Sequence, residues 1–494
     1  MAIVHPTYII KNSNENKVGR YVVAGRDLKA GDQIFQEEVF SIGPKSGTSL
    51  ICLGCYLPLE ELKLCNNCKW PICSPECSQD PWHKNYECAL FSQKGVKLNE
   101  EADLSAQLEC ITPLRTLIVS EKQNERWEKE VINMEAHIEE RRKKAEWKVE
   151  QVNVIKFLAE ACKLKDRFNE EKIEKICGIL EVNCFEVITK LGISIRGLYP
   201  LMALLNHNCI ANTTHSIFLN SNYRLQLRTT VDTKSGCELF SSYTSSLQPT
   251  IVRRARLREC KYFDCTCARC SDPTEMGTHI GTFKCTKCDD GIITSTQPLD
   301  DNAAWKCSHC DNGITGNGVQ RIYLAIQEDM AELEQMEMSG EKLEATEKLL
   351  RKYKSVLHPR NGSNVLLWHS LSQMYGHTEG YSLDMLPDLL LERKSKFCKD
   401  LLDILNVVEP GLTRIRGLTL FEYHIGCLLY TKSRYQHGEF GMDALKERIG
   451  SVVDILKECH QILSLEPEGS PEAMLAASAQ QSINQLIESV KQLQ

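Results

Sequence analysis

The sequence predicts a multidomain α+β protein in which small strand-rich units are stabilised by zinc and the last third is helical. Three observations favour this fold class. Short β-branched runs alternate with turn residues near the N-terminus. Cysteines recur in CxxC and CxC pairs between positions 52 and 310. From about Val319 onward the pairs stop and long amphipathic segments take over.

Length and composition bound the class of protein. At 494 residues the chain can form two to four compact units. A net charge of -7 with 25% charged residues argues against phosphate-driven nucleic-acid binding. No apolar run reaches the ~18 residues needed to span a bilayer, and residues 1–40 lack a signal-peptide pattern. We therefore expect a soluble monomer without membrane contact, in the cytoplasm and nucleus.

The cysteine usage indicates metal binding. Eleven of the 24 cysteines lie in CxxC or CxC pairs, with histidine nearby. In a cytosolic chain this pattern is typical of zinc ligands, whereas disulfides are rare there.

Residues 8–40 are predicted to form two or three short strands. The runs 21–24 and 33–35 are rich in β-branched and aromatic residues, and Gly25 and residues 29–32 supply turns.

Residues 52–88 carry the strongest metal signal. Eight ligand-type residues occur here in pairs, enough for two tetrahedral zinc sites: Cys52, Cys55, Cys65, Cys68, Cys73, Cys77, His83 and Cys88. Metal binding worth ~10 to 16 kcal/mol would replace a hydrophobic core in so short a segment.

Residues 98–184 are predicted to be helical, because apolar residues recur three and four apart, as in Trp127, Val131 and Met134. The charged run 139–144 is interpreted as a solvated helix face, with a nuclear-import signal as the alternative.

The stretch 197–270 ends in an incomplete metal site. Cys265, Cys267 and Cys270 supply three thiolates, and structural zinc takes four ligands, so we expect Cys209 to be the fourth. Within this stretch, residues 223–228 alternate polar and apolar and predict an exposed strand leading to Glu238 and Leu239.

A further zinc site is predicted from a ribbon-like spacing. Cys285 and Cys288 are followed after eighteen residues by Cys307 and Cys310. Four thiolates leave zinc no open position, so this site is interpreted as structural.

The remaining chain predicts antiparallel helix pairs stacked as a superhelix. Amphipathic segments cover 323–353, 386–407 and 449–465, with breaks at Pro359, Pro410 and Pro467. This region would wall one side of a cleft and bind partners.

The motifs resemble those of the SET-domain lysine methyltransferases, and within them the SMYD branch, in which a MYND finger interrupts the SET domain. The resemblance rests on Asn206-His207-x-Cys209, on Glu238-Leu239 with Tyr243, and on the CxCxxC cysteines 265–270. It is closer still to the arthropod SmydA group, through residues 271–275, 410–412 and 416–417.

The resemblance implies a domain order along nearly the whole chain. The SET-type β fold would be split by the finger and a helical insert, and a TPR-like domain would follow the ribbon. The expected bounds are N-terminal SET 1–50, MYND finger 52–88, helical insert 89–182, C-terminal SET 183–264, post-SET 265–280, zinc ribbon 281–316 and helical domain 317–494.

The resemblance also implies how the finger pairs its ligands. Cys52, Cys55, Cys73 and Cys77 would hold one zinc, and Cys65, Cys68, His83 and Cys88 the other, so that about four structural zinc ions are expected in the chain. MYND fingers usually capture proline-rich peptides, which are therefore expected partners.

The activity implied is methyl transfer from S-adenosylmethionine to a lysine of a protein or peptide. Tyr243 would lie where the methyl group passes and orient the amine. A narrow apolar channel would lower the lysine pKa from about 10.4 and favour the uncharged amine. Other residues would hold the donor or line the channel: Gly19, Arg20, Asn206, His207 and Phe263 for the donor, Asn183 and Phe185 at the channel rim. A capping Asn183 and a core Phe185 are the alternative.

Several positions depart from the family pattern. Only Gly19 remains of the usual glycine loop, which here begins Lys17-Val18. Lys261 stands where a channel tyrosine is usual, and its ammonium would repel an incoming lysine unless it points outward. Tyr262 is expected to face away on an extended strand.

Two functions follow. The first is a protein-lysine methyltransferase acting on histones, other proteins or both, linked to transcriptional regulation. The alternative is a weak or inactive zinc-stabilised adaptor that binds proteins through its finger and helical domain.

Overall fold

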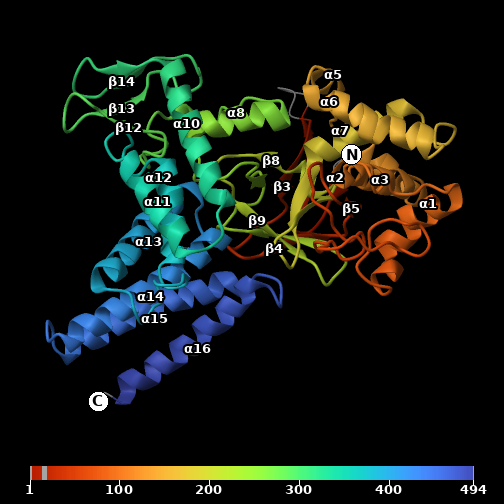
Figure 1. Ribbon diagram of the computed structural model, residues 1–494. Coiled ribbons are helices and arrows are strands. Elements are labelled where there is room, and N and C mark those ends of the chain that lie inside the picture. The colour runs from red at the N-terminus through yellow and green to blue at the C-terminus, as the bar shows by residue number, and fades with distance from the viewer. Residues whose placement is uncertain (1–2, 14–18, 493–494) are drawn as a thin grey trace.

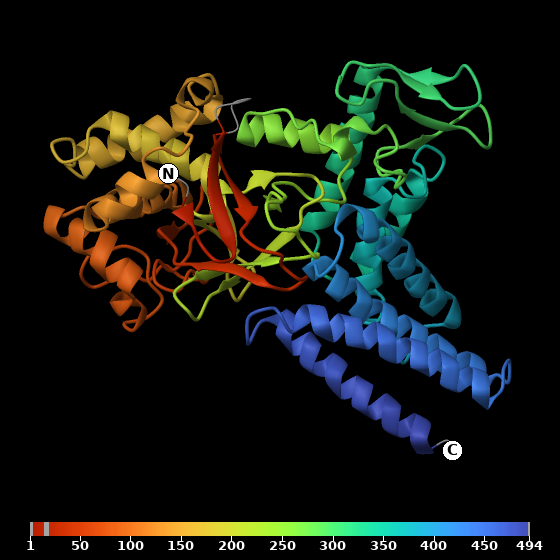
Figure 2. The same cartoon turned by 180° about the vertical axis from the view of Figure 1, so that it is seen from behind.

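The computed structural model describes residues 3–13 and 19–492. It has the mixed α+β, multidomain architecture that the sequence predicts. Figures 1 and 2 show the short strands in the middle, with the helices α1–α7 on one side and a long helical arm on the other.

Short strands fill most of the N-terminal segment, as predicted. β1, β2 and β3 form an antiparallel sheet, and β4 joins a different one. Val22, Val23 and Ala24 of β3 are buried, which anchors this sheet in the core. The bounds are β1 (Ile3–Val4), β2 (Tyr8–Ser13), β3 (Gly19–Ala24) and β4 (Gln33–Glu37).

A second small sheet closes a long excursion of the chain. β5 (Ser41–Gly43) pairs antiparallel with β7 (Ser194–Leu198), which also pairs with β6 (Cys184–Ile188). Residues 44–183 therefore leave the strand region and return to it. This topology explains how a finger and a helical segment can interrupt one β fold.

The strand predicted to be exposed is instead the central strand of its sheet. β10 (Arg224–Thr229) lies between β4 and β9 (Thr213–Phe218), and Leu225, Gln226 and Leu227 are buried. The prediction was wrong because β10 has a neighbouring strand on each side. In such a strand a polar side chain can be buried when it has a hydrogen-bond partner. Gln226 finds that partner in Gln33.

The excursion folds as the finger and then as helices. The finger contains a 3₁₀ turn (Cys77–Gln79) and a π-helical turn (His83–Cys88). Asp103 and Asn169 cap the starts of α2 and α7 by accepting backbone N–H groups. The helical elements are α1 (Ala89–Lys94), α2 (Leu104–Leu108), α3 (Ile111–Lys122), α4 (Asn124–Arg126), a π turn (Trp127–Val131), α5 (Ile138–Arg141), α6 (Ala145–Glu150), a π-helical segment (Gln151–Ala161) and α7 (Glu170–Asn183).

One buried arginine ties the finger to the strands. Arg115 of α3 donates to Glu87 in the finger over 2.7 Å, to the hydroxyl of Tyr56 and to the carbonyl of Ile42 in β5. Removing a partner from a buried charge costs several kcal/mol of stability. These contacts therefore hold the finger firmly against the strand region.

The charged run 139–144 is not a purely solvated face. Arg141 is buried and pairs with Glu150 and Glu181, and Arg142 pairs with Glu174. The helix there covers only Ile138–Arg141. Both central arginines are committed to ion pairs inside the insert, which also disfavours the alternative of an import signal.

The ribbon region forms an antiparallel sheet of four short strands. Phe283, Ile293 and Trp305 are buried against Val319 and Tyr323 of α10 (Gly316–Gln335). Its strands are β12 (Phe283–Lys284), β13 (Ile292–Ser295), β14 (Trp305–Cys307) and β15 (Gly313–Ile314).

The helical arm stacks each helix on the next, as the amphipathic pattern predicts. Its core lies in two clusters, one around Leu371 and Leu401 and another around Leu456 and Ile483. In the described residues no helix has the length and apolarity to cross a membrane. The helices are α10 (Gly316–Gln335), α11 (Gly340–Lys352), α12 (Gly362–Met374), α13 (Asp388–Val408), α14 (Arg414–Gln436), α15 (Met442–Leu463) and α16 (Pro471–Gln492).

A tight turn docks the arm on the strands. Gly411 has φ +83°, and a Cβ at this position would lie 2.0 Å from the carbonyl oxygen of Thr230. Leu412 donates its N–H to the same oxygen over 2.9 Å. Only glycine allows this approach and this backbone conformation. The break at Pro410-Gly411 is therefore a contact between two regions of the protein.

Candidate active site and metal centres

Ligand-type side chains gather into four compact groups in the described residues. Within each group the four ligand atoms lie within 4.8 Å of one another. A tetrahedral thiolate site with Zn–S of about 2.3 Å would place its sulfurs about 3.8 Å apart. The Sγ atoms of Cys55 and Cys73 are 3.6 Å apart, so the geometry fits zinc. The groups are the predicted ones: Cys52, Cys55, Cys73 and Cys77; Cys65, Cys68, His83 and Cys88; Cys209, Cys265, Cys267 and Cys270; Cys285, Cys288, Cys307 and Cys310.

The histidine of the finger is oriented by a carboxylate. His83 Nδ1 lies 2.9 Å from Glu87, and its Nε2 faces Cys68 at 3.7 Å. Arg115 holds the same Glu87. A carboxylate on the far ring nitrogen is the usual way in which proteins orient a zinc-binding histidine.

The third group joins distant segments. Cys209 follows β8 (Asn206–His207), whereas Cys270 lies in α9 (Ala268–Ser271), and their sulfurs are 3.5 Å apart. A zinc ion here would close the loop that carries Tyr243. Cys209, expected from the ligand count as the fourth ligand, thus lies beside the other three cysteines.

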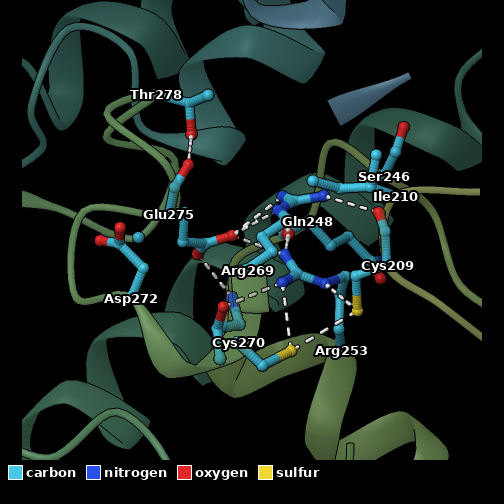
Figure 3. A network of polar contacts seen from close by, with 12 residues as sticks. Cys209, Ile210, Ser246, Gln248, Arg253, Arg269, Cys270, Asp272, Glu275 and Thr278 are labelled. Atoms are coloured by element: carbon cyan, nitrogen blue, oxygen red, sulfur yellow. Dashed lines mark hydrogen bonds and ion pairs between the residues drawn. The ribbon is translucent and has the colours of Figure 1, made fainter. Parts of the chain in front are cut away.

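Two arginines and a glutamate surround this group, as Figure 3 shows. Arg253 of α8 (Thr250–Lys261) points its guanidinium at Cys209, 3.3 Å away, and at Cys270, 3.5 Å away. Arg253 and Arg269 both pair with the buried Glu275. Four thiolates around Zn²⁺ would leave a net charge of -2. Because Glu275 is also negative, the two guanidinium groups offset this charge only in part.

The fourth group lies in the ribbon sheet. The sulfurs of Cys285 and Cys310, and those of Cys288 and Cys307, are each 3.6 Å apart. The chain offers all four ligands of a tetrahedral site, so a zinc ion here would be structural.

Tyr243 lies in an aromatic cluster that two short strands bring together. β11 (Phe240–Ser241) pairs in parallel with β8, which sets Tyr243 beside His207. The centroid of its ring lies 5.2 Å from that of His207 and 6.5 Å from that of Phe263. Burial raises the pKa of Tyr243 to about 12, so the phenol stays protonated at neutral pH.

The two motif residues on β8 already have partners within the protein. His207 Nδ1 accepts the backbone N–H of Tyr243 over 3.0 Å, and Nε2 lies 3.2 Å from Cys209 Sγ. Asn206 donates its amide to Glu238 over 2.7 Å. Burial lowers the pKa of His207 to about 4, so the ring is neutral. A bound ligand would therefore meet the ring face of His207.

Gly19 and Arg20 lie at the same end of the strands as Tyr243. Leu239 donates its N–H to Val22, and β3 runs antiparallel to the segment that leads to β11. The start of β3 therefore points toward Tyr243. Gly19 has φ +67° and open space around it, a conformation that favours glycine. Lys17 and Val18 lie outside the described residues.

Lys261 points inward. Its ammonium donates to the carbonyl of Val182 over 2.5 Å and lies 5.3 Å from the ring centroid of Tyr243. Burial lowers its pKa. The sequence left two orientations open for Lys261, outward or beside the channel. In the structure the ammonium lies beside Tyr243.

Tyr262 is not on an extended strand as expected. It ends α8 with φ 61°, a left-handed conformation. Its ring stacks on His137 at 4.4 Å, and its hydroxyl donates to Glu181. The side chain is directed toward His137 and Glu181, away from Tyr243 as expected. The cause is the left-handed turn at the end of α8, and not the alternation of a strand.

Asn183 and Phe185 have the contacts of the alternative considered for them. Asn183 ends α7 and donates its amide to the carbonyls of Ile179 and Glu135. The Phe185 ring packs edge-on against Tyr199 and His215. Both side chains therefore contribute to packing within the protein.

An open cavity of about 740 Å³ begins at Tyr243. It runs between α8 and α10, with Ile251, Val252 and Leu324 as apolar lining and Glu259 and Asp301 among the charged residues. An extended peptide could lie there with one side chain directed at Tyr243.

Several groups in the site were not predicted. The carbonyl of Val182 accepts from Lys261 and that of Leu205 accepts from the Tyr243 hydroxyl. Neither carries a sequence signal, because any residue supplies a carbonyl. Arg253 could have been found: Thr250, Arg253 and Leu257 have the spacing of one helix face, and a buried arginine indicates a buried negative partner.

Comparisons with known proteins find relatives that are named as SET domain-containing proteins or lysine methyltransferases. No family model matches the chain. SmydA-8 isoform A, a SET domain-containing protein of Drosophila melanogaster, is 29% identical over 55% of this chain and 58% of its own length. Histone-lysine N-methyltransferase Smyd1 of Mus musculus is 30% identical over 51% and 54%. Histone-lysine N-methyltransferase ASHR1 of Arabidopsis thaliana is 21% identical over 91% of both chains. The chain thus spans somewhat more than half the length of the first two.

Proposed function

We propose that this chain, a relative of the SMYD proteins, transfers methyl groups from S-adenosylmethionine to lysine side chains of proteins. Histones, other proteins or both would be substrates, with a role in transcriptional regulation in the cytoplasm and nucleus. The observation that carries the proposal is the half-buried, protonated Tyr243, whose ring forms a triangle with the rings of His207 and Phe263.

The bound donor would supply an electrophilic methyl group. The chain must then position an amine and keep it uncharged. Tyr243 offers a neutral phenol to orient the amine lone pair. Burial at this site lowers the pKa of Lys261, and the same desolvation would act on an incoming lysine. Phe263 would stack on the adenine, and Gly19, Arg20, Asn206 and His207 would surround the rest of the donor.

The four ligand groups would each hold a structural zinc. The ion bound by Cys209 matters most for activity, since it connects β8 with the segment that carries Phe263. Target peptides would follow the cavity at Tyr243, and the finger would bind proline-rich peptides near its surface hollow at Asn66 and Pro75.

The test is incubation of zinc-replete protein with methyl-labelled S-adenosylmethionine and either histones or a cytosolic extract. Wild type should label at least one protein, and Tyr243→Phe should label none while still binding the donor. Equal labelling by both would remove Tyr243 from the proposed role.

One observation favours the adaptor as a second candidate: the ammonium of Lys261 lies beside Tyr243. An adaptor would retain its protein partners in Tyr243→Phe and lose them in Cys65→Ser, because that variant disrupts the finger. The reverse pattern in a pull-down would exclude it.

A further inference from the structure

The surroundings of Lys261 are those of a bound amine. Its side chain leaves the last turn of α8 and runs toward the end of α7, where the carbonyl oxygen of Val182 accepts a hydrogen bond from the ammonium. The ammonium also faces the Tyr243 ring at 5.3 Å. A carbonyl acceptor and an aromatic face are the groups that recognise a primary ammonium.

The Val182 carbonyl is free to accept a hydrogen bond from an amine because of its place in α7. It lies in the last turn of α7, where carbonyl groups have no partner within the helix. The negative end of the helix dipole also favours a cation there. A substrate lysine entering beside Tyr243 would find the same acceptor, if Lys261 were absent.

A second lysine at the same junction provides a comparison. Lys144 donates to the carbonyl of Glu259 in the last turn of α8 and lies 4.5 Å from the ring centroid of Tyr262. Both lysines therefore bind a helix end and an aromatic face. Only Lys261 does so at Tyr243.

We propose that Lys261 is a tethered occupant of the amine-binding position beside Tyr243 and competes with a substrate lysine for that position. The inference rests on the proposed function, since it takes Tyr243 to mark the place of the target amine.

The competition has two physical sources. A tethered amine is present at a high effective concentration, so a free amine must displace it. Two ammonium groups within a few ångströms in a buried site also repel each other strongly. The apparent affinity for a substrate amine is then the intrinsic affinity multiplied by the fraction of molecules in which the position is open.

The probe for the experiment is n-butylamine, which has the carbon chain and amine of lysine. Its binding is measured by calorimetry on the full chain, in the presence of S-adenosylhomocysteine. Lys261→Met removes the ammonium and keeps the length of the side chain. Lys261→Arg keeps a cation, and Lys144→Met removes the matched lysine at the same junction.

Lys261→Met should bind n-butylamine at least tenfold more tightly than wild type. Lys261→Arg and Lys144→Met should bind like wild type. A thermal melt checks that each variant is folded, and Lys261→Tyr replaces Lys261→Met if the latter is not. Affinity in Lys261→Met or Lys261→Tyr no higher than in wild type, undetectable binding included, would overturn the proposal.

The result separates this inference from the proposed function. Binding of S-adenosylhomocysteine without a gain in Lys261→Met rejects the tethered occupant and leaves the methyltransferase in place. If neither wild type nor any variant binds S-adenosylhomocysteine, that result counts against the methyltransferase. The affinities for n-butylamine are then compared in the absence of S-adenosylhomocysteine.

Discussion

The phenol of Tyr243 donates a hydrogen bond to the backbone carbonyl of Leu205, 2.5 Å away. Leu205 immediately precedes Asn206 and His207, so this bond connects the two halves of the site. This hydrogen bond holds the hydroxyl in one position instead of leaving it free to rotate, as a catalytic phenol requires.

Tyr243→Phe should therefore abolish methyl transfer at small cost in stability. Loss of one hydrogen bond costs about 1 kcal/mol of unfolding free energy. Donor affinity should change little, because the aromatic ring remains. The measurements are transfer of labelled methyl to histones, donor titration and urea unfolding. Retained transfer at more than a tenth of the wild-type rate would contradict the role given to the hydroxyl.

Cys209→Ser should reduce bound zinc by one ion per chain. It should also weaken donor binding, because the segment carrying Phe263 loses its anchor at β8. Metal content by plasma mass spectrometry and donor titration measure the two effects. The control is Cys237→Ser, since Cys237 is exposed and outside the four ligand groups. Equal zinc in both variants would show that Cys209 is not a ligand.

Arg253→Met should destabilise the protein by about 3 kcal/mol, because Glu275 and two cysteine sulfurs lose a buried partner. Zinc should also be removed faster by a chelator. Arg256→Met is the matched control: Arg256 lies on the same helix with 63% of its side chain exposed, and its loss should cost less than about 0.5 kcal/mol. A similar small cost for Arg253→Met would mean that the buried network is dispensable.

Glu37 should make stability depend on pH. Its carboxylate accepts the N–H groups of Leu201 and Met202, yet burial raises its pKa from 4.5 to about 7. The folded state thus binds the proton more tightly than the unfolded state. The contribution to stability is complete below about pH 4.5 and is lost as pH rises through 7.

Comparison with Glu37→Gln isolates this effect. Relative to that variant, wild type should lose about 3 kcal/mol of unfolding free energy between pH 4.5 and 7.5. Glu38→Gln is the control, since Glu38 is exposed and pairs with Arg224 at the surface. Parallel pH profiles for wild type and Glu37→Gln would refute the assignment.

The four groups of ligand-type side chains could be predicted from the sequence because their chemistry is local. CxxC pairs are visible in a few residues, and the missing fourth ligand at Cys265–Cys270 follows from the coordination number of zinc. The strands of residues 8–40 were likewise indicated by β-branched runs between turns.

The errors concern residues whose surroundings come from distant parts of the chain. Gln226 is buried because strands flank it on both sides, which the alternation along β10 does not reveal. α8 was missed because its buried face carries Arg253 and Arg254, and their partners lie in other segments. The orientation of Lys261 depends on the end of α7, about eighty residues earlier in the sequence.

The most direct test of the account is calorimetric titration of zinc-replete wild-type protein with S-adenosylmethionine. The site around Tyr243, His207 and Phe263 predicts binding of one molecule per chain with micromolar affinity, lost in Phe263→Ala. No heat of binding from a folded sample with its zinc in place would contradict the methyltransferase and leave the adaptor as the better account.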